Sequence, residues 1–189
     1  PDTLDWDMYC GPAPLRPYNR MIHPGGFRHY LDFANGTLGD WGVHWLDQML
    51  WWCDQQSPIS VHSVGGRPVR GEAVLNDVEQ TSDAPDSQVA TYQFESFTAI
   101  WEHRRFAGDG PEKTSVGCYF YGDKGMFHMG WRDGWTFYPD DPKKPVIHQD
   151  SELQEPDGHN IQLLWADFLH AIETGKKPVA GIEIGHQAT

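Results

Sequence analysis

The sequence is short of positive charge and has no long apolar run. Its 189 residues include 14 lysines and arginines against 27 aspartates and glutamates, which gives a formal net charge of −13. Such an acidic surface repels phosphate backbones and anionic lipid headgroups, so neither nucleic acid nor a membrane surface is an expected partner. No apolar stretch approaches the roughly 18 residues that a membrane-spanning helix needs.

Cysteine is also scarce. Cys10, Cys53 and Cys118 are the only three, and they are far apart without a CxxC pair. An odd, sparse set argues against a disulfide framework and against a thiolate zinc site, and we expect the last two to be core thiols. Pro1 is followed by neither a basic region nor an apolar segment, so no signal peptide is visible. A cytoplasmic location is expected, and any export signal would precede Pro1.

Several catalytic and nucleotide-binding motifs are missing. The chain has no GxGxxG after a strand, no GxxxxGK[ST], no GxSxG and no HExxH. It therefore carries no dinucleotide-binding fingerprint of its own and no strained serine turn. What it does have is aromatic residues, at 13% of the sequence and with 9 tryptophans. Tryptophans either stack on sugar rings or fill a core or an interface, and composition leaves both readings open.

Hydrophobic patterning predicts one α+β domain over residues 1–189. Residues 1–35 form an irregular arm rich in proline, glycine and aromatics, and residues 36–189 form the body, which we expect to be truncated at the C-terminus. Helices are predicted at 39–54 and 161–174, the second opened by 157–160 and ended by Gly175, and 181–189 reads as the start of another helix. Alternation predicts strands at 59–64, 89–95, 97–102, 115–121, 125–129 and 135–138.

Short connections between these strands, such as 122–125, suit hairpins, and the link 104–114 reads as a longer hairpin loop. Residues 140–156 read as a charged connection. The pattern thus predicts a mostly antiparallel open sheet with helices on one face. Because the strands alternate aromatics on both sides, we also expect a homo-oligomer built through the sheet.

The most informative segment places Asp40, His44 and Asp47 at i, i+4 and i+7. On a helix this spacing aligns two carboxylates and an imidazole along one face. The rest of the segment is almost entirely apolar, so we expect the helix to be buried on most sides and Asp40 and His44 to form a buried acid–base pair. A histidine satisfied within the core and a divalent metal site at the three residues are the alternatives.

Seven motifs in a fixed order carry a family resemblance: LDWDMYCGPAP (4–14), RPY (16–18), HP (23–24), FR (27–28), GTLGDWGVHWLD (36–47), DGH (157–159) and FLHAIETGKKP (168–178). Together they resemble the C-terminal domain of the glucose–fructose oxidoreductase / inositol dehydrogenase / MocA family. Members of that family join an N-terminal Rossmann domain, which holds NAD or NADP, to a C-terminal α/β domain that contacts substrate and often forms the oligomer interface.

The resemblance implies that this chain is the substrate-binding C-terminal part of an NAD(P)-dependent oxidoreductase that acts on a sugar, cyclitol or glycoside. Its partner would be the parent's N-terminal Rossmann domain, which would hold most of the cofactor, so this chain alone is expected to be inactive. His44 matches the family's proton-transfer histidine, and Asp40 would orient that ring or bind a sugar hydroxyl. Asp47 is expected to be structural, paired with an arginine of the arm. Four further residues are candidates for substrate contacts: Arg28, Tyr18, His23 and His159.

Two other functions stay open. Some relatives with this fold cleave glycosides by transient oxidation with bound NAD, although their helix motif tends to show asparagine where this chain has Asp40. A non-catalytic carbohydrate-binding domain is the other reading, and the tryptophan content favours it.

Overall fold

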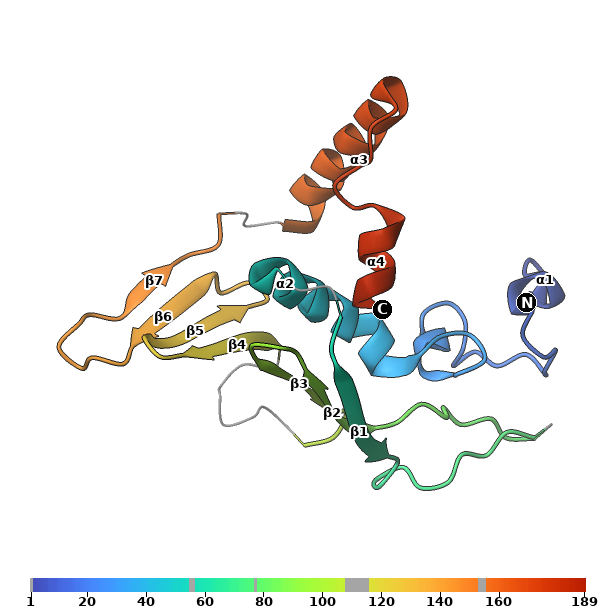
Figure 1. Ribbon diagram of the computed structural model, residues 1–189. Coiled ribbons are helices and arrows are strands. Elements are labelled where there is room, and N and C mark those ends of the chain that lie inside the picture. The colour runs from blue at the N-terminus through green and yellow to red at the C-terminus, as the bar shows by residue number, and fades with distance from the viewer. Residues whose placement is uncertain (1, 55–56, 77, 108–115, 153–155) are drawn as a thin grey trace. The chain divides into compact units, whose positions relative to one another are not determined.

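The computed structural model describes residues 2–54, 57–76, 78–107, 116–152 and 156–189, with the side chains of 156–159 left out. The chain divides into two compact units, which are taken separately: unit 1 is Pro1–Ala107 with Gly185–Thr189, and unit 2 is Gly108–Ile184. The described strands form two open antiparallel sheets rather than one, and the fold is α+β, as the sequence predicts (Figure 1). The single-domain organisation stays a prediction.

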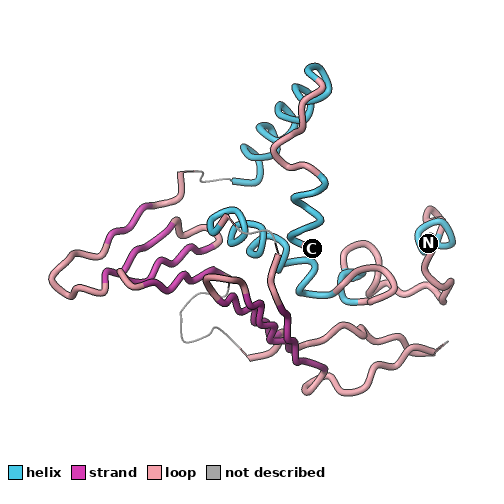
Figure 2. The backbone as a smooth tube through the Cα atoms, viewed as in Figure 1, coloured by secondary structure: helices cyan, strands magenta, loops and turns pink. Residues whose placement is uncertain are grey.

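Unit 1 contains the arm, the central helix and a three-stranded sheet. In chain order its elements are α1 (Trp6–Cys10), the 3-10 helix η1 (Gly26–His29), the π-helix η2 (Leu38–Gly42), α2 (Val43–Cys53), β1 (Ser60–Gly66), β2 (Ser87–Gln93) and β3 (Thr98–Arg104). The long connection between β1 and β2 is loop (Figure 2). Helix α4 (Ile182–Ala188) ends in this unit.

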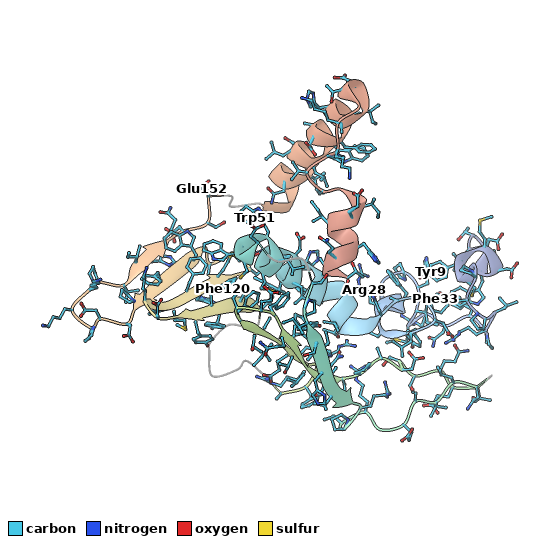
Figure 3. All side chains as sticks on the ribbon, viewed as in Figure 1. Tyr9, Arg28, Phe33, Trp51, Phe120 and Glu152 are labelled. Carbon is cyan, nitrogen blue, oxygen red and sulfur yellow. The ribbon has the colours of Figure 1, made fainter. Side chains whose placement is uncertain are left out.

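The arm is more ordered than the sequence predicts, because it holds α1 and η1. The Asp5 side chain caps α1 by accepting a hydrogen bond from the Met8 amide at 3.0 Å, a pattern too short to produce helical periodicity. Rings then tie the arm together. Trp6 stacks on Tyr9 with ring centres 5.2 Å apart, and Tyr9 also lies near Phe33 (Figure 3).

The predicted helix 39–54 is present, but its first turn is not α-helical. Leu38–Gly42 forms a π turn that leads directly into α2. Gly42 is buried where this turn meets β3, since a Cβ placed on it would lie 3.8 Å from the Trp101 ring and 2.7 Å from the Leu38 side chain. Nothing in the hydrophobic pattern distinguishes such a turn from an ordinary helix start.

Sheet β1-β2-β3 has one covered face and one exposed face. Its register pairs Tyr92 with Ala99 and Ala90 with Trp101, and these side chains share the face that is largely covered. The opposite face carries Val64, Val89 and Ile100, the last of which is 68% exposed. The strand pairing therefore exposes three apolar side chains on a face that they share with polar residues such as Thr91 and Glu102.

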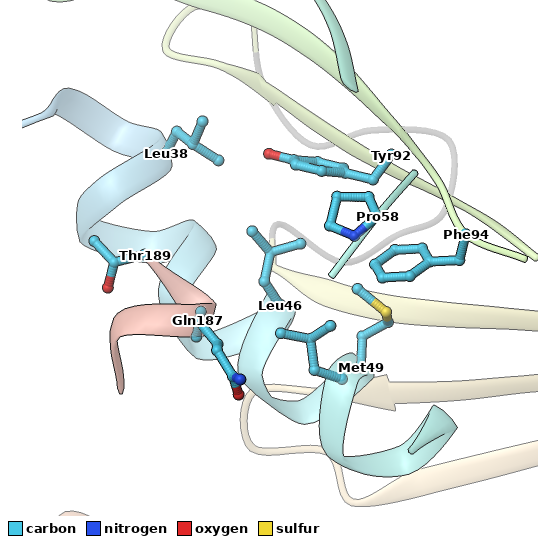
Figure 4. Close-up of a pocket in the computed structure, with 10 residues that line it drawn as sticks. Leu38, Leu46, Met49, Pro58, Tyr92, Phe94, Gln187 and Thr189 are labelled. Carbon is cyan, nitrogen blue, oxygen red and sulfur yellow. The ribbon is translucent and has the colours of Figure 1, made fainter. Parts of the chain in front are cut away.

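The covered side of α2 borders an apolar cavity of about 190 Å³ inside unit 1 (Figure 4). Leu46 and Met49 of α2 line it opposite Tyr92 and Phe94 of the β2 region. The last residues of the chain, including Thr189, close one side. The cavity holds no charged side chain, so it belongs to the packing of the helix against the sheet.

Unit 2 contains the second sheet and the long helix. Its elements are β4 (Gly117–Gly122), β5 (Gly125–Gly130), β6 (Trp135–Pro139), β7 (Ile147–Gln149) and α3 (Pro156–Thr174). The predicted 122–125 hairpin is confirmed by the pairing of Gly122 with Gly125. Strand β7 was not predicted, because it is three residues long and lies in a charged, proline-bearing stretch. The predicted hairpin loop 104–114 lies mostly outside the described residues.

The faces of sheet β4–β7 differ in chemistry. One carries Phe120, Phe127 and Trp135, and the other carries the cross-strand row Tyr119, His128, Thr136 and His148. Cys10 is buried, whereas Cys53 and Cys118 are only half-buried, so the expectation that these two lie in the core is wrong. In the part of the chain that the structure describes, no helix is long and apolar enough to cross a membrane.

Candidate functional site

An ion pair joins the arm to the π turn at the start of the central helix. Arg28 Nε of η1 donates to Asp40 Oδ1 of η2 at 2.9 Å, and Arg28 Nη1 donates to the Gly25 carbonyl oxygen at 3.0 Å. The guanidinium also lies over the Phe27 ring, 4.7 Å from its centre. The two side chains are 42% and 28% exposed, so the pair contributes at most about 1 kcal/mol to stability. Its main effect is to hold the Asp40 carboxylate in one orientation.

His44 follows one turn later, on the outer face of α2. Leu46 and Met49 face the cavity, whereas His44, Asp47 and Trp51 recur at i, i+3 and i+7 on the opposite face. His44 is exposed, and Trp51 is 81% exposed (Figure 3). The expectation of a buried acid–base pair is therefore wrong. The helix that carries His44 is apolar on more than one face, but only one of those faces is packed within the described chain.

The arm's arginine pairs with Asp40, not with Asp47 as the sequence suggested. Among the described residues, Asp47 makes no ion pair. Another arginine of the arm, Arg16, pairs with Asp32. The π turn accounts for this choice, since it displaces the Asp40 side chain from the regular helical register and brings it to the arm. Such turns occur frequently at functional sites.

The remaining candidates lie elsewhere. Tyr18 packs edge-on against Trp6 with ring centres 5.1 Å apart, and His23 packs edge-on against Tyr9 at 5.0 Å. The contacts that the structure gives these two residues are with the aromatic cluster of the arm, not with the Asp40 carboxylate. His159 lies in α3, and its side chain is outside the described part of the chain.

A second polar cluster, which the sequence analysis did not find, adjoins this ion pair. It is organised by residues 83–86, which precede β2. The amides of Asp83 and Ala84 both donate to the His29 carbonyl oxygen, each at 3.1 Å. At the other end of the segment, the Arg70 amide donates to Asp86 Oδ2 at 2.9 Å and the Arg105 amide donates to the Asp86 carbonyl oxygen at 2.8 Å. Four distant stretches of sequence therefore meet here.

The cluster combines a buried carboxylate, Asp86, with partly buried basic side chains, His29 and Arg105. Asp86 is 1% exposed, and its Oδ1 has no hydrogen-bond partner among the described residues. Burial lowers the pKa of His29, and the positive charges of Arg105, Arg70 and Arg28 lower it further, while Asp40 opposes them. The Arg105 guanidinium itself has a lowered pKa because it is partly buried and lies near Arg70.

A second histidine, His103, closes the cluster on the sheet side. Its Nδ1 accepts a hydrogen bond from the Trp101 indole N–H at 3.0 Å, and an indole nitrogen only donates, so this ring nitrogen is unprotonated. Burial lowers the pKa of His103, with a smaller contribution from Arg105. The signal that could have located the cluster is the density of arginines and histidines in an acidic chain. No spacing rule links residues 29, 70, 86, 103 and 105, because tertiary contacts alone bring them together.

No group of three or more histidine, cysteine, aspartate or glutamate side chains in the described ranges is arranged to hold a metal ion. The groups that the structure places near the start of α2 can exchange hydrogen bonds and protons. An oriented carboxylate and an exposed imidazole on one helix suit transfer of a proton to or from a hydroxyl group.

Comparison with solved structures concerns the fold. The chain is similar to the structure of yvaA from Bacillus subtilis, a proposed oxidoreductase, with a TM-score of 0.54 at 15% identity. The likeness covers 80% of this chain and 45% of the yvaA chain, so this chain spans less than half the length of that protein. At this identity the comparison shows the fold alone, and the fold is α+β.

Comparison of the sequence gives the family. Residues 1–107 match the C-terminal alpha/beta domain of the GFO/IDH/MocA oxidoreductase family. The chain belongs to that family, which confirms the resemblance carried by its motifs. The matched range ends at the same residue as the first segment of unit 1 and includes both Asp40 and His44. No curated protein matches the sequence.

Proposed function

We propose that this chain is the substrate-binding domain of an NAD(P)-dependent oxidoreductase that acts on a sugar, cyclitol or glycoside. The observation that carries the proposal is the Asp40–Arg28 ion pair beside the exposed His44, in a domain of this oxidoreductase family. A parent enzyme of this kind would place the substrate hydroxyl against the outer face of α2.

Oxidation of an alcohol requires that the hydroxyl proton leaves as the carbon loses its hydride. His44 would accept that proton, because imidazole is the side chain that exchanges protons near neutral pH. Asp40, held by Arg28, would accept a hydrogen bond from the imidazole or from a second hydroxyl of the substrate. The nicotinamide cofactor, when bound, supplies the hydride acceptor. In the reverse direction His44 would return the proton to the carbonyl oxygen.

The residues of this chain do not fit the cofactor. Nicotinamide dinucleotides bind at the switch point of parallel βαβ units with a glycine-rich turn, and both sheets of the described residues are antiparallel. The sequence also lacks the GxGxxG motif. The proposal therefore assigns NAD or NADP to an N-terminal Rossmann domain of the parent. It predicts that calorimetry detects no micromolar NAD binding to this chain alone.

The outer face of sheet β1-β2-β3 supports a further part of the proposal, a homo-oligomer. Val64 of β1 and Ile100 of β3 are exposed there on the two outer strands of the sheet, where each would contribute apolar area to a second copy. Light scattering of the parent tests this point, and a monomer at all concentrations would contradict it.

The decisive experiment uses the full-length parent enzyme and follows NAD(P)H absorbance with a panel of sugars, cyclitols and aryl glycosides. In the parent, His44→Ala is expected to reduce turnover by roughly 10²–10⁴-fold, as loss of a general base does. His170→Ala, which removes an exposed histidine of α3, is the matched control. Near-normal turnover of the His44 variant would refute the assignment. Glycoside cleavage without net cofactor reduction would instead identify a redox-assisted hydrolase.

A further inference from the structure

The cluster around residues 83–86 gathers two arginines, Arg70 and Arg105, in a strongly acidic chain. Arg70 and Arg105 each donate a backbone amide hydrogen bond to Asp86, so both arginine backbones lie beside the same residue of the segment. The same segment also holds His29, whose carbonyl oxygen accepts the amides of Asp83 and Ala84, and the positive charges of Arg70 and Arg105 both lower the pKa of the His29 ring.

The donors of the cluster are only partly used. A guanidinium group carries five N–H donors. Arg70 uses one side-chain donor, Nη1, on the Ser82 hydroxyl at 2.9 Å. Within the described residues the Arg105 side chain makes no hydrogen bond or ion pair, and His29 Nδ1 is a buried ring nitrogen without a partner. Two guanidinium groups and one imidazole nitrogen thus retain unused hydrogen-bonding capacity at one place.

Burial is the main reason that the pKa of Arg105 is lowered, and the nearby positive charge of Arg70 lowers it further by like-charge repulsion. A bound anion would relieve it, and planar guanidinium groups match the oxygen geometry of carboxylate and phosphate groups. The cluster is also adjacent to the candidate site, since His29 follows Arg28 in η1 and feels the charge of Asp40.

We propose that Arg70, Arg105 and His29 form a binding site for an anionic oxygen group, and that this group is the carboxylate or phosphate of the substrate. Calling the ligand a substrate rests on the proposed function, whereas the binding site itself does not. The bound anion would accept hydrogen bonds from both guanidinium groups, and His29 would donate through the nitrogen that has no partner now. The substrate class is thereby narrowed from any sugar-like alcohol to a sugar acid or a sugar phosphate.

The test measures binding, not turnover. Calorimetry on the chain compares inorganic phosphate, glucuronate, glucose 6-phosphate and glucose. Glucuronate or glucose 6-phosphate should bind at least tenfold more tightly than glucose. Glucuronate as the tighter of the two identifies a carboxylate ligand, and glucose 6-phosphate as the tighter identifies a phosphate ligand. Equal affinity for glucose and both anionic sugars, or no binding of any of the four, would overturn the proposal.

Two variants separate the site from general charge effects. The double variant Arg70→Gln/Arg105→Gln should weaken anion binding at least tenfold, because it removes charge-assisted hydrogen bonds but keeps both backbone amides on Asp86. The matched control, Arg20→Gln/Arg132→Gln, removes the same charge from two exposed arginines and should retain binding. An equal loss in both double variants would show that net charge alone attracts the anion, and the proposal would then be wrong.

A measurement on the unaltered chain keeps the test valid should the cluster variant fail to fold. Addition of phosphate must shift the NMR resonances of the His29 ring, which are assigned with His29→Gln. Unchanged His29 resonances under saturating phosphate, glucuronate and glucose 6-phosphate would overturn the site. Failure of the parent to reduce NAD(P) would refute the oxidoreductase proposal and leave this binding result standing, so the two failures are distinguishable.

Discussion

Replacement of Asp86 by alanine tests how the polar cluster is held. The Asp86 side chain is 1% exposed and accepts a hydrogen bond from the Arg70 amide at 2.9 Å. Hydrogen bonds to a charged group contribute about 1.5–3 kcal/mol, and a buried amide left without an acceptor costs a similar amount. We therefore expect Asp86→Ala to lower the free energy of unfolding of unit 1 by about 1.5–3 kcal/mol. Against a typical total of about 5–15 kcal/mol, this is a large loss.

Asp83 provides the matched control, because it makes the same kind of bond in a wetter place. Its Oδ1 accepts a hydrogen bond from the Leu31 amide at 2.7 Å, and this contact is exposed. Water replaces the carboxylate there, so Asp83→Ala should cost below about 1 kcal/mol.

The assay is urea denaturation followed by tryptophan fluorescence, with hydrogen exchange of the Arg70 and Arg105 amides as a local measurement. Asp86→Ala should lower the urea midpoint without changing the slope, and it should speed exchange at Arg70 more than at Arg105, whose amide keeps the backbone carbonyl. Equal midpoints for the two variants would refute the reasoning, because burial would then not decide the cost.

Two further predictions concern titration and backbone conformation. Burial lowers the pKa of both His29 and His103, so below the ordinary histidine value of about 6.5 the unfolded chain binds more protons than the folded one. The stability that these rings contribute is complete above that pH and is lost as the pH falls through their folded pKa values. His103→Gln should therefore weaken the pH dependence of the urea midpoint between pH 5 and 8, whereas His62→Gln, at an exposed histidine, should leave it unchanged. The reverse result would contradict the assignment. Gly125 has φ +143°, and a Cβ there would lie 2.2 Å from a carbonyl oxygen of β6, so Gly125→Ala should destabilise unit 2 by at least about 1–3 kcal/mol. A Cβ on Gly122 would meet nothing closer than 3.9 Å, so thermal melts of Gly122→Ala should match the unaltered chain, and equal melting of both variants would count against the steric argument.

The sequence predicted the regular elements well because their patterns are local. Alternation located β1 to β6 within a few residues, and glycine marked the end of α3 at Gly175, which has φ +68°. Helix α1, with five residues, and strand β7, with three, escaped because each completes less than two periods of its own pattern. The division of the strands into two sheets also escaped, since periodicity describes each strand alone and says nothing of which strands pair.

The candidate site was predicted only in part. Motif spacing brought Asp40, His44 and Arg28 into consideration, and the structure joins Asp40 to Arg28. The exposure of His44 was mispredicted because apolar composition indicates a capacity for burial, not the presence of a covering element. The cluster around Asp86 could not be predicted at all, because its hydrogen bonds join residues 16 to 55 positions apart, and bonds between such segments leave no periodic trace.

The π turn Leu38–Gly42 has a consequence for how sequence length is tolerated in this protein. A π turn accommodates one residue more than an α-helical turn, so the helix contains a built-in insertion between the arm and α2. Deleting one residue there would restore regular winding and rotate everything before it by roughly 100° about the helix axis. Arg28 and its neighbours would turn away from His44 although no side chain had been replaced. The length of this five-residue turn therefore fixes the rotation of the arm about the helix axis. A change in that length would alter the rotation more than a change of residue type would.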